Sequence, residues 1–288
     1  MKPARRAEPY LFLAPTLGLL ALFFLIPFFI AAKESLFSWD LLTPRTFVGL
    51  ANYETLVVRG ELWRAFRNTM TYSAIVVTGA LLLGLLLALL LDRQGRVAAF
   101  VRGAIFSAYV VSWVAVALLF MWLLDGEAGL LTRIVVAVGL PKQNWLGDAN
   151  VALYTIAAVS IWKIAGYAMI IFLAGLQDIP PVLYEAAALD GAGRLEKFRT
   201  ITWPALGPSA AFVATTSLIL SFQAFDVVRI MTQGGPVHAT ELFVYAIYEQ
   251  VFLNLRVGRA SALTLLFGVL VFSLTALQLR LFRGKGTT

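Results

Sequence analysis

The sequence contains no cysteine and a single histidine, His238, among its 288 residues. Disulfides, thiolate nucleophiles and cysteine-ligated metal sites are therefore excluded, as are metal sites built from several histidines. Charged residues are also scarce, at 14% of the chain, whereas a typical soluble domain has about 25%. These absences leave little material for the polar clusters on which most enzymes depend.

Hydrophobic residues make up 60% of the chain, well above the usual range of about 45–50%. A soluble fold of this size cannot bury so much apolar surface, so the chain is predicted to lie in a lipid bilayer. The net charge of +7 comes from short basic clusters between apolar runs. Nucleic-acid binding requires a continuous basic face, which is absent, so no nucleic-acid partner is expected.

Six segments are apolar over the roughly 20 residues that a helix needs to cross a hydrocarbon core about 30 Å thick. They lie at about 10–32, 70–91, 103–124, 151–176, 205–225 and 260–282. The first is longer than the apolar core of a signal peptide and no typical cleavage site follows it, so it is expected to be retained. The predicted fold class is therefore all-α integral membrane, with six transmembrane helices in one domain.

The predicted orientation follows from the distribution of lysine and arginine. If the N-terminus lies inside, the inner segments carry basic residues at about twice the density of the outer ones. Residues 1–9 and 283–288 are accordingly expected to be cytoplasmic, on either side of a transmembrane domain that covers residues 10–282. The inner loop at 177–204 is unusually long for this side.

Loop 177–204 has the signals of a short helix. Pro180 and Pro181 end the fourth span and suit an opening helical turn, where no N–H donor is needed. Residues 182–189 favour helix, and Gly191 is a natural stop because glycine adopts the left-handed conformation cheaply. The three alanines at 186–188 permit close approach to a partner. An alternative is a connector lying on the membrane, although such a helix favours bulky apolar residues.

A second short helix is expected at about 193–203, because apolar side chains recur there at helical spacing. The basic side chains of this segment lie mostly on its other face, next to phospholipid headgroups. Pro204 then marks the entry to the fifth span. The two short helices together make this loop the most structured connection on the predicted inner side.

The pattern Glu-Ala-Ala, then Asp-Gly-Ala, then a proline exit resembles the EAA motif of permeases from ABC importers. The matching residues are Glu185, Ala186, Ala187, Asp190, Gly191, Ala192 and Pro204. In that family the loop forms a coupling helix that docks on a cytoplasmic ATPase. The resemblance therefore implies a type I ABC-importer permease architecture.

Further segments resemble carbohydrate-type permeases over nearly the whole chain. They lie at 47–53, 65–69, 144–148, 162–163, 172–180 and 233–236. The sequence departs from the family at Ser107-Ala108-Tyr109, where Leu-Pro-Tyr is more usual. Because proline bends helices, its absence predicts the loss of a kink in the third span.

The resemblance implies a subunit of a binding-protein-dependent importer of the maltose type, and the chain is also similar to permeases for glycerol 3-phosphate. The implied partners are a second related permease, in a heterodimer, an ATPase dimer that binds ATP and Mg, an extracytoplasmic solute-binding protein, and membrane lipid. This chain is expected to hold no cofactor or metal and to have no catalytic residue. The expected location is a bacterial or archaeal cytoplasmic (inner) membrane.

Several polar and aromatic residues lie within the predicted spans, where a buried charge is costly. The residues expected to face a central solute pathway are Lys163, Gln223, Asp226, Trp162, Tyr167 and Phe222. The three aromatic rings offer surfaces on which a sugar can stack. Two structural alternatives stay open for Lys163: an ion pair with Asp226, or hydrogen bonds to backbone carbonyls of a partner subunit.

The last outer loop contains Gly234, Gly235 and Pro236, which form a turn by their own chemistry. By resemblance, the solute-binding protein docks here. The C-terminal stretch at 283–288 superficially resembles a phosphate-binding loop but lacks the required spacing, so ATP hydrolysis is assigned to another polypeptide. A secondary transporter is the main alternative, and the lack of an obvious internal repeat argues mildly against it.

Overall fold

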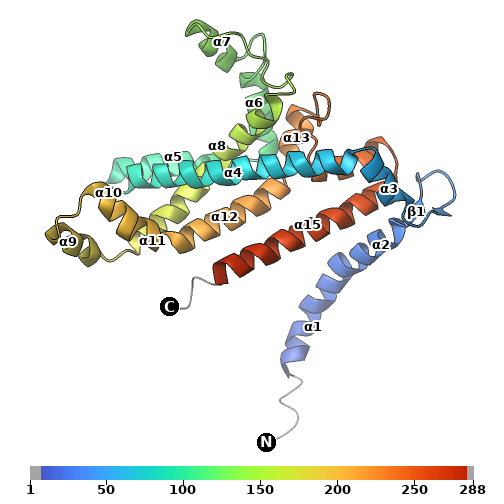
Figure 1. Cartoon of the computed structure of the whole chain (residues 1–288), viewed down its shortest axis with the longest axis horizontal. Helices are drawn as coiled ribbons and strands as arrows, with labels where there is room; N and C mark the ends of the chain where they lie inside the picture. Colours follow the sequence, from blue (N-terminus) through green and yellow to red (C-terminus); the bar gives the residue numbers. More distant parts are fainter. Residues whose placement is uncertain (1–7, 284–288) are drawn as a thin grey trace, which may run out of the picture. The chain divides into compact units, whose positions relative to one another are not determined.

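The computed structural model describes residues 8–283 (Figure 1). The chain divides into a terminal unit, residues 1–63 and 246–277, and a central unit, residues 64–245 and 278–288. Each is described separately below. The termini predicted at 1–9 and 283–288 fall almost entirely outside the described residues.

The terminal unit begins with a continuous apolar helix, and its elements follow in chain order. They are α1 (Glu8–Leu20), the π-turn η2 (Ala21–Leu25), α2 (Ile26–Glu34), β1 (Phe37–Ser38), β2 (Thr46–Phe47) and α3 (Ala51–Val58). After the central unit come η4 (Glu249–Leu253) and α15 (Val257–Arg283). The helix Phe12–Glu34 is strongly apolar, and none of its most apolar stretch is buried, as expected of a helix solvated by lipid or by another membrane subunit.

The short hairpin of this unit is held by polar contacts. β1 and β2 pair antiparallel, with Phe37 opposite Phe47. The buried Asn52 amide donates to the carbonyls of Ser35 and Phe37, at 2.8 and 2.9 Å. Arg45 forms a 2.7 Å ion pair with Glu34. These bonds satisfy backbone groups that a loop at a membrane boundary would otherwise leave without partners.

The central unit contains most of the helices. It comprises most of α4 (Glu61–Leu91), then α5 (Arg96–Val110), α6 (Trp113–Leu123), α7 (Leu130–Ala137), α8 (Ala152–Gln177), α9 (Pro181–Leu189), α10 (Arg194–Lys197), η3 (Phe198–Thr202), α11 (Trp203–Ala205), α12 (Gly207–Phe222) and α13 (Asp226–Met231). It ends in α14 (Phe243–Tyr248), whose last three residues belong to the terminal unit.

Helix α8 is the buried centre of this unit, with two thirds of its apolar window covered. Small residues let its neighbours approach closely. A Cβ at Gly84 of α4 would lie 2.5 Å from the Ala168 side chain, and one at Gly166 would lie 2.6 Å from the Ile105 carbonyl oxygen of α5. Such small-residue contacts are the usual means of packing helices in membranes, where no hydrophobic effect drives helices together.

Helices lie on all six predicted spans. Within residues 8–283, four helices are long and apolar enough to cross a membrane singly, and the number is six if each of two bent pairs forms one span. Helix α4 begins at Glu61, nine residues before the predicted second span, so Arg64 and Arg67 lie on its N-terminal extension. The helical membrane fold is therefore confirmed.

The expectation that the third span loses its kink is wrong. The helix direction bends by 100° between α5 and α6, with extended backbone at Val111 and Ser112 between them. Proline is one way to break a helix. A break inside a membrane can also be maintained without proline, where neighbouring groups donate hydrogen bonds to the freed backbone carbonyls. Here the sequence departs from the Leu-Pro-Tyr pattern and still keeps the break.

Candidate solute pathway and coupling loop

Loop 177–204 folds as its turn residues predict. α9 begins at Pro181 after Pro180 and ends at Leu189. Gly191 has φ +80°, the Ala192 N–H bonds to the Ala187 carbonyl at 2.9 Å, and the Gly191 N–H bonds to the Ala188 carbonyl at 3.2 Å. These two hydrogen bonds define a Schellman motif, in which glycine allows the chain to reverse at the helix end.

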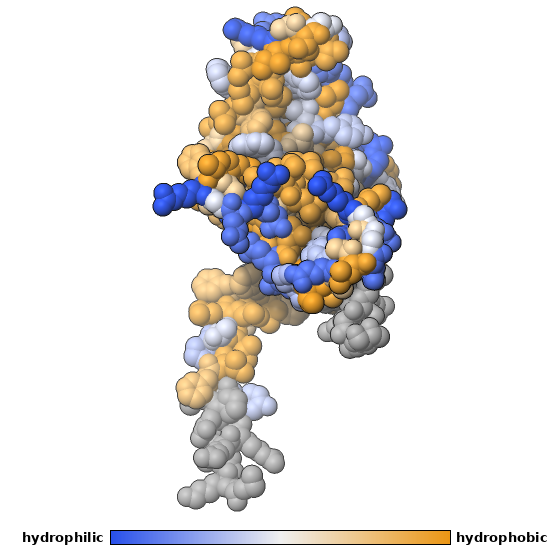
Figure 2. All heavy atoms as spheres, turned by 90° about the vertical axis from the view of Figure 1, so that its left-hand side faces the viewer, coloured by the Kyte–Doolittle hydropathy of each residue, from blue (hydrophilic) through white to orange (hydrophobic). Residues whose placement is uncertain are grey.

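Helix α9 is exposed on one side and fixed on the other. Leu189 is 90% exposed, and Glu185 and Ala186 are exposed as well. Figure 2 views the end of the central unit that carries α9 and α10, where hydrophilic side chains border exposed hydrophobic ones. Val182 and Leu183 of this helix are exposed as well, and a group of exposed apolar side chains rimmed by polar ones is typical of a protein-docking surface.

Tyr184 connects α9 to the rest of the central unit. Its ring packs against a core formed by α4, α8 and α12, and its hydroxyl lies 2.9 Å from the Thr202 hydroxyl of η3. Thr202 is buried, and Ile201 packs against the same core, whereas Leu195, another apolar residue of the predicted helix at 193–203, is 62% exposed. Tyr184 thus connects α9 to the helices of the central unit through both packing and a hydrogen bond.

A small polar pocket lies where two helices are broken. α12 ends at Phe222 and α13 begins at Asp226, so residues 223–225 form a second break. The pocket measures about 180 Å³, and its lining residues are Trp113, Leu220, Gln223, Ala224, Phe225, Asp226 and Val227. Broken helices in transporters expose backbone groups for solute binding, so this pocket is the candidate pathway site.

The sequence-predicted pathway residues divide between several environments. Gln223 and Asp226 line the polar pocket together. Trp162 instead lines an apolar groove and packs edge-on against Phe120, while Tyr167 stacks on Tyr109 at 4.9 Å. Phe222 is buried, with 6% of its surface exposed. The structure thus brings together two of the six residues in the pocket.

Lys163 is the third of the predicted polar residues, and it is 2% exposed. Its ammonium donates hydrogen bonds to the carbonyls of Ala108, at 3.2 Å, Tyr109, at 3.0 Å, and Val111. Among the described residues, it forms no ion pair with Asp226. Of the two structural alternatives, hydrogen bonding of Lys163 to backbone carbonyls is the one observed. The carbonyls belong to this chain and not to a partner subunit.

Trp113 of the pocket was missed by sequence reasoning. It is the first residue of α6 and follows Ser112, a residue type that often precedes a helix. That signal is available in the sequence, but it lies inside a long apolar run that favours an unbroken span. The second break, at residues 223–225, has no comparable signal.

The outer loop around Gly234 is tightly ordered. Gln233, Gly234, Val237 and His238 all have positive φ, and the Thr240 hydroxyl bonds to the Gly235 carbonyl at 2.7 Å. Gly234 is buried against the Tyr245 ring, whereas Val237 is 87% exposed. The glycines and proline therefore shape the turn, and its exposed apolar tip is a residue that sequence reasoning did not select.

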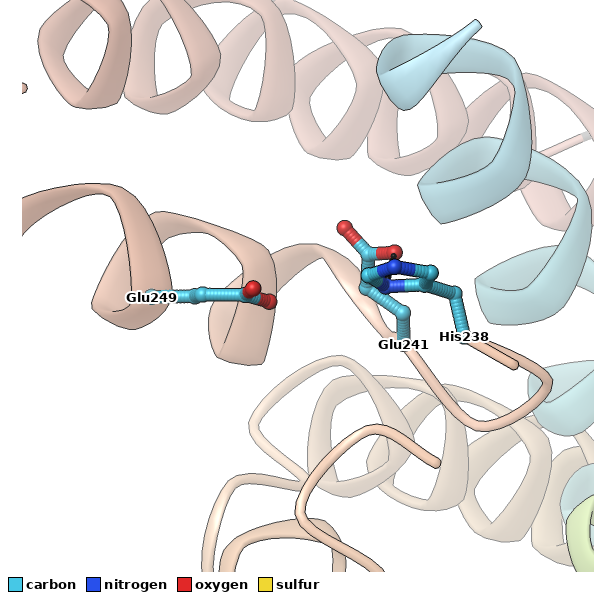
Figure 3. A group of neighbouring side chains, drawn as sticks. All are labelled: His238, Glu241 and Glu249. Carbon is cyan, nitrogen blue, oxygen red and sulfur yellow. Dashed lines mark ion pairs between the residues drawn. The ribbon is translucent and has the colours of Figure 1, made fainter. Parts of the chain in front are cut away.

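Glu241 ties this loop to α4 from inside. Its buried carboxylate lies 2.9 Å from His238 Nδ1 and 3.7 Å from Arg64 Nε. Figure 3 shows the Glu241 carboxylate beside the His238 ring. The Asn68 amide donates to the carbonyls of His238 and Glu241, at 2.9 and 3.3 Å. Side chains near the start of α4 thus determine the shape of the turn.

We expect Glu241→Gln to lower the free energy of unfolding by about 1–3 kcal/mol, because it weakens the contacts that the buried carboxylate makes with the half-exposed Arg64 and His238 side chains. Thermal unfolding of the purified protein measures the effect. Glu127→Gln, at an exposed outer-loop position, is the matched control and should change nothing. Equal unfolding midpoints for the two variants would show that the ion pair does not order the loop.

Basic residues gather at the opposite end of α4. Arg102 Nη1 donates to the carbonyls of Leu91 and Arg93, at 3.0 and 3.1 Å, and Arg93, Arg102 and Gln177 line one shared pocket. The α4–α5 turn therefore adjoins the end of α8 that leads into α9. Between Asn68 and Leu91, α4 covers about 35 Å, which is enough to separate the outer loop from this end by a bilayer.

The family of binding-protein-dependent transport system inner membrane components matches residues 80–286. The probable ABC transporter permease YurN of Bacillus subtilis is 34% identical over 280 residues, covering 96% of both chains. The sn-glycerol-3-phosphate transport system permease UgpA of Agrobacterium fabrum is 33% identical over 274 residues, covering 94% of this chain and 93% of that one.

Among solved structures, a bacterial ABC transporter involved in the import of the acidic polysaccharide alginate shares the fold. Its TM-score is 0.82 at 22% identity, covering 99% of this chain and 98% of that chain. The fold likeness agrees with the family match and with two close sequence relatives that are themselves permeases. This chain therefore belongs to the family of binding-protein-dependent transport system inner membrane components and is a permease subunit of an ABC importer.

Proposed function

We propose that this permease forms one side of the pathway for a carbohydrate or a related polyol phosphate, with Gln223, Asp226 and Trp113 on its wall. The observation that carries the proposal is the polar pocket at the junction of two broken helices. An amide, a carboxylate and an indole are suited to hydroxyl groups and to the apolar face of a sugar ring. The relatives for sn-glycerol 3-phosphate and the alginate transporter support this solute class.

Transport is powered from outside this chain. The sequence has no phosphate-binding loop, so ATP and Mg are bound by a separate ATPase dimer, and this subunit is not catalytic. Helix α9 docks in that ATPase through Glu185 and its alanine face. When the ATPase dimer closes, it pulls α9, and Tyr184 and Thr202 pass the movement to α8 and α12, which switches the permease between inward- and outward-facing states.

The remaining subunits complete the importer. A second, related permease supplies the other side of the pathway, forming a heterodimer. An extracytoplasmic solute-binding protein docks near Gly234, Gly235 and Pro236, where Val237 projects. No metal or cofactor is assigned to this chain.

The basic end of the central unit supports the orientation. Arg93 and Arg102 lie beside the exit of α8 toward α9. Basic loops are retained on the cytoplasmic side, so α9 and both chain termini are cytoplasmic in this proposal. The outer loop near His238 then faces the solute-binding protein.

Purification of this chain from its native membrane in a mild detergent tests the proposal. The expected result is co-purification of a P-loop ATPase and a second permease, with ATPase activity that rises when a solute-loaded binding protein is added. Comparison of an oligosaccharide, a monosaccharide and sn-glycerol 3-phosphate as the loaded solute identifies the substrate class. Glu185→Ala should weaken recovery of the ATPase, while Glu127→Ala, in an outer loop, should leave it unchanged.

Two outcomes would contradict the proposal. Recovery of a lone chain that transports solute without an ATPase would favour an ion-coupled carrier. Recovery of the full complex with stimulation only by solutes of another class, such as amino acids, would retain the importer and reject the carbohydrate assignment.

A further inference from the structure

The break between α5 and α6 creates a local shortage of hydrogen-bond donors. The last four carbonyls of any helix have no intrahelical donor, and in a membrane no water is available to replace it. Here the chain continues through Val111 and Ser112 in extended conformation, and only the Ser107 carbonyl regains a backbone donor, from the Val111 N–H at 3.3 Å. The carbonyls that follow need a donor from elsewhere.

Lys163 supplies that donor from α8. Its ammonium reaches the carbonyls of Ala108, Tyr109 and Val111, which lie on both sides of the end of α5. A positive charge at this position also complements the negative end of the α5 dipole. An ammonium has three N–H groups, and three carbonyls accept from it, so none is left over for a phosphate or hydroxyl of a solute.

Gly166 makes this contact possible. It follows Lys163 by one turn on α8, and a Cβ there would lie 2.6 Å from the Ile105 carbonyl oxygen and 2.9 Å from the Phe106 Cα. Because glycine has no Cβ, α8 and α5 approach at backbone distance. The lysine side chain can then reach the end of α5 without leaving the buried interior.

The contact also fixes the start of α6. The Lys163 ammonium lies 5.0 Å from the centre of the Trp113 ring, within the range of a cation–π interaction. Trp113 is the first residue after the break and lines the polar pocket with Gln223 and Asp226. The position of this ring in the pocket therefore depends on the same ammonium group that holds the break.

We propose that Lys163 is a positioning residue that keeps α5 and α6 bent, and that it thereby holds Trp113 on the wall of the solute pocket. The role of the pocket in transport rests on the function proposed above, whereas the control of the bend does not. In this account the lysine stabilises the break with its charge, and the break persists without the proline of the Leu-Pro-Tyr pattern. It does not touch the solute.

Spin labels on either side of the break measure the bend directly. The chain has no cysteine, so Val97→Cys on α5 and Trp122→Cys on α6 introduce its only labelling sites, both at exposed positions. At 1.5 Å per residue, the two Cα atoms are about 24 Å apart at a bend of 100° and about 38 Å apart in a straight helix. The assembled complex in lipid is measured by pulsed electron paramagnetic resonance without solute.

Lys163→Met keeps an unbranched side chain that is one atom shorter and removes the charge and the hydrogen-bond donors. We expect the ratio of bent to straight helix to fall at least roughly tenfold, because hydrogen bonds to a charged donor are lost, and the distances to broaden toward the longer value. Uptake should fall in parallel. Lys142→Met, in an exposed outer loop, is the matched control and should retain the short distance.

A second substitution provides the rescue. Ala108→Pro introduces a residue that bends a helix without any charge, and the Ala104 carbonyl that it would orphan already accepts a bond from the Ser107 hydroxyl at 2.7 Å. Ala108 borders an open apolar groove, which leaves room for the ring. In the Lys163→Met background, Ala108→Pro should restore both the short distance and uptake.

Unchanged distances in Lys163→Met would overturn the proposal. If uptake falls while the distances stay short, and proline does not restore it, Lys163 acts directly on the solute. If the distances lengthen but no tested carbohydrate or polyol phosphate is transported by the unmodified complex, the positioning role stands and the proposed substrate class fails.

Discussion

Gly191→Val is expected to abolish solute uptake while the associated ATPase continues to hydrolyse ATP. The φ of +80° at Gly191 is required by the two hydrogen bonds that end α9. A β-branched residue in this conformation costs about 2 kcal/mol, which reduces the population of the correctly ended helix roughly thirtyfold. The chain then leaves α9 in a different direction, and Asp190 and Ala192 lose their positions relative to the ATPase.

The measurement compares uptake and ATP hydrolysis by the purified complex in lipid vesicles. Gly193→Val is the matched control, since Gly193 lies in the same loop with φ −73° and an added Cβ there meets no atom within 4 Å. It should retain most of the uptake. Normal uptake by Gly191→Val would mean that the reversal at the end of α9 is not needed for coupling.

Gly166→Val should lower the stability of the central unit by about 3 kcal/mol, a large fraction of the 5–15 kcal/mol typical of a folded protein. The added Cβ meets the Ile105 carbonyl oxygen and the Phe106 Cα, which are backbone atoms and cannot rotate away. α5 must therefore separate from α8, and the Lys163 ammonium loses its carbonyl partners. Thermal unfolding and the yield of assembled complex report the change.

Gly103→Val separates the steric clash at Gly166 from any change in helix propensity that replacing glycine with valine causes. Gly103 also lies inside a helix, α5, but its added Cβ meets no atom within 4 Å. The control should therefore assemble normally. If both variants assembled equally well, the close approach of α5 and α8 would not be essential to the fold.

Much of the fold is readable from the sequence because the membrane imposes a local rule. A spanning helix must satisfy its own backbone hydrogen bonds, so each span needs only its own apolar residues, and helices lie on all six predicted segments. The observed helix boundaries differ from the predicted span boundaries mainly where a helix extends beyond the apolar segment, as α4 does at Glu61. Hydropathy reports the part of the helix in lipid and not the polar turns outside it.

The loop at 177–204 is also determined locally. Pro181 at the first turn of α9 and Gly191 after its end act through their own backbone geometry, so their effects can be predicted without knowing any neighbour. The surfaces that this loop presents are readable for the same reason. The partner that it contacts is not, because nothing within the loop specifies the other surface.

The pathway required the tertiary structure. Trp162, Lys163 and Tyr167 lie close together in the sequence, yet their side chains enter an apolar groove, the end of α5 and a stack on Tyr109. Successive side chains on a helix point about 100° apart, so closeness in sequence does not predict a shared site. Which face of α8 meets which neighbour depends on packing along its whole length.

The sequence by itself determined that this chain is a helical membrane protein with a short helix in the exposed loop at 177–204, because apolar run length and turn chemistry act within a few residues. Only the tertiary structure decided what Lys163 does. Its partners lie 52 to 55 residues earlier in the chain, and they are carbonyls, which every residue possesses and no pattern marks. Their need for a donor arises from the break between α5 and α6. Lys163 can supply that donor because Gly166 lets α8 approach α5 at backbone distance.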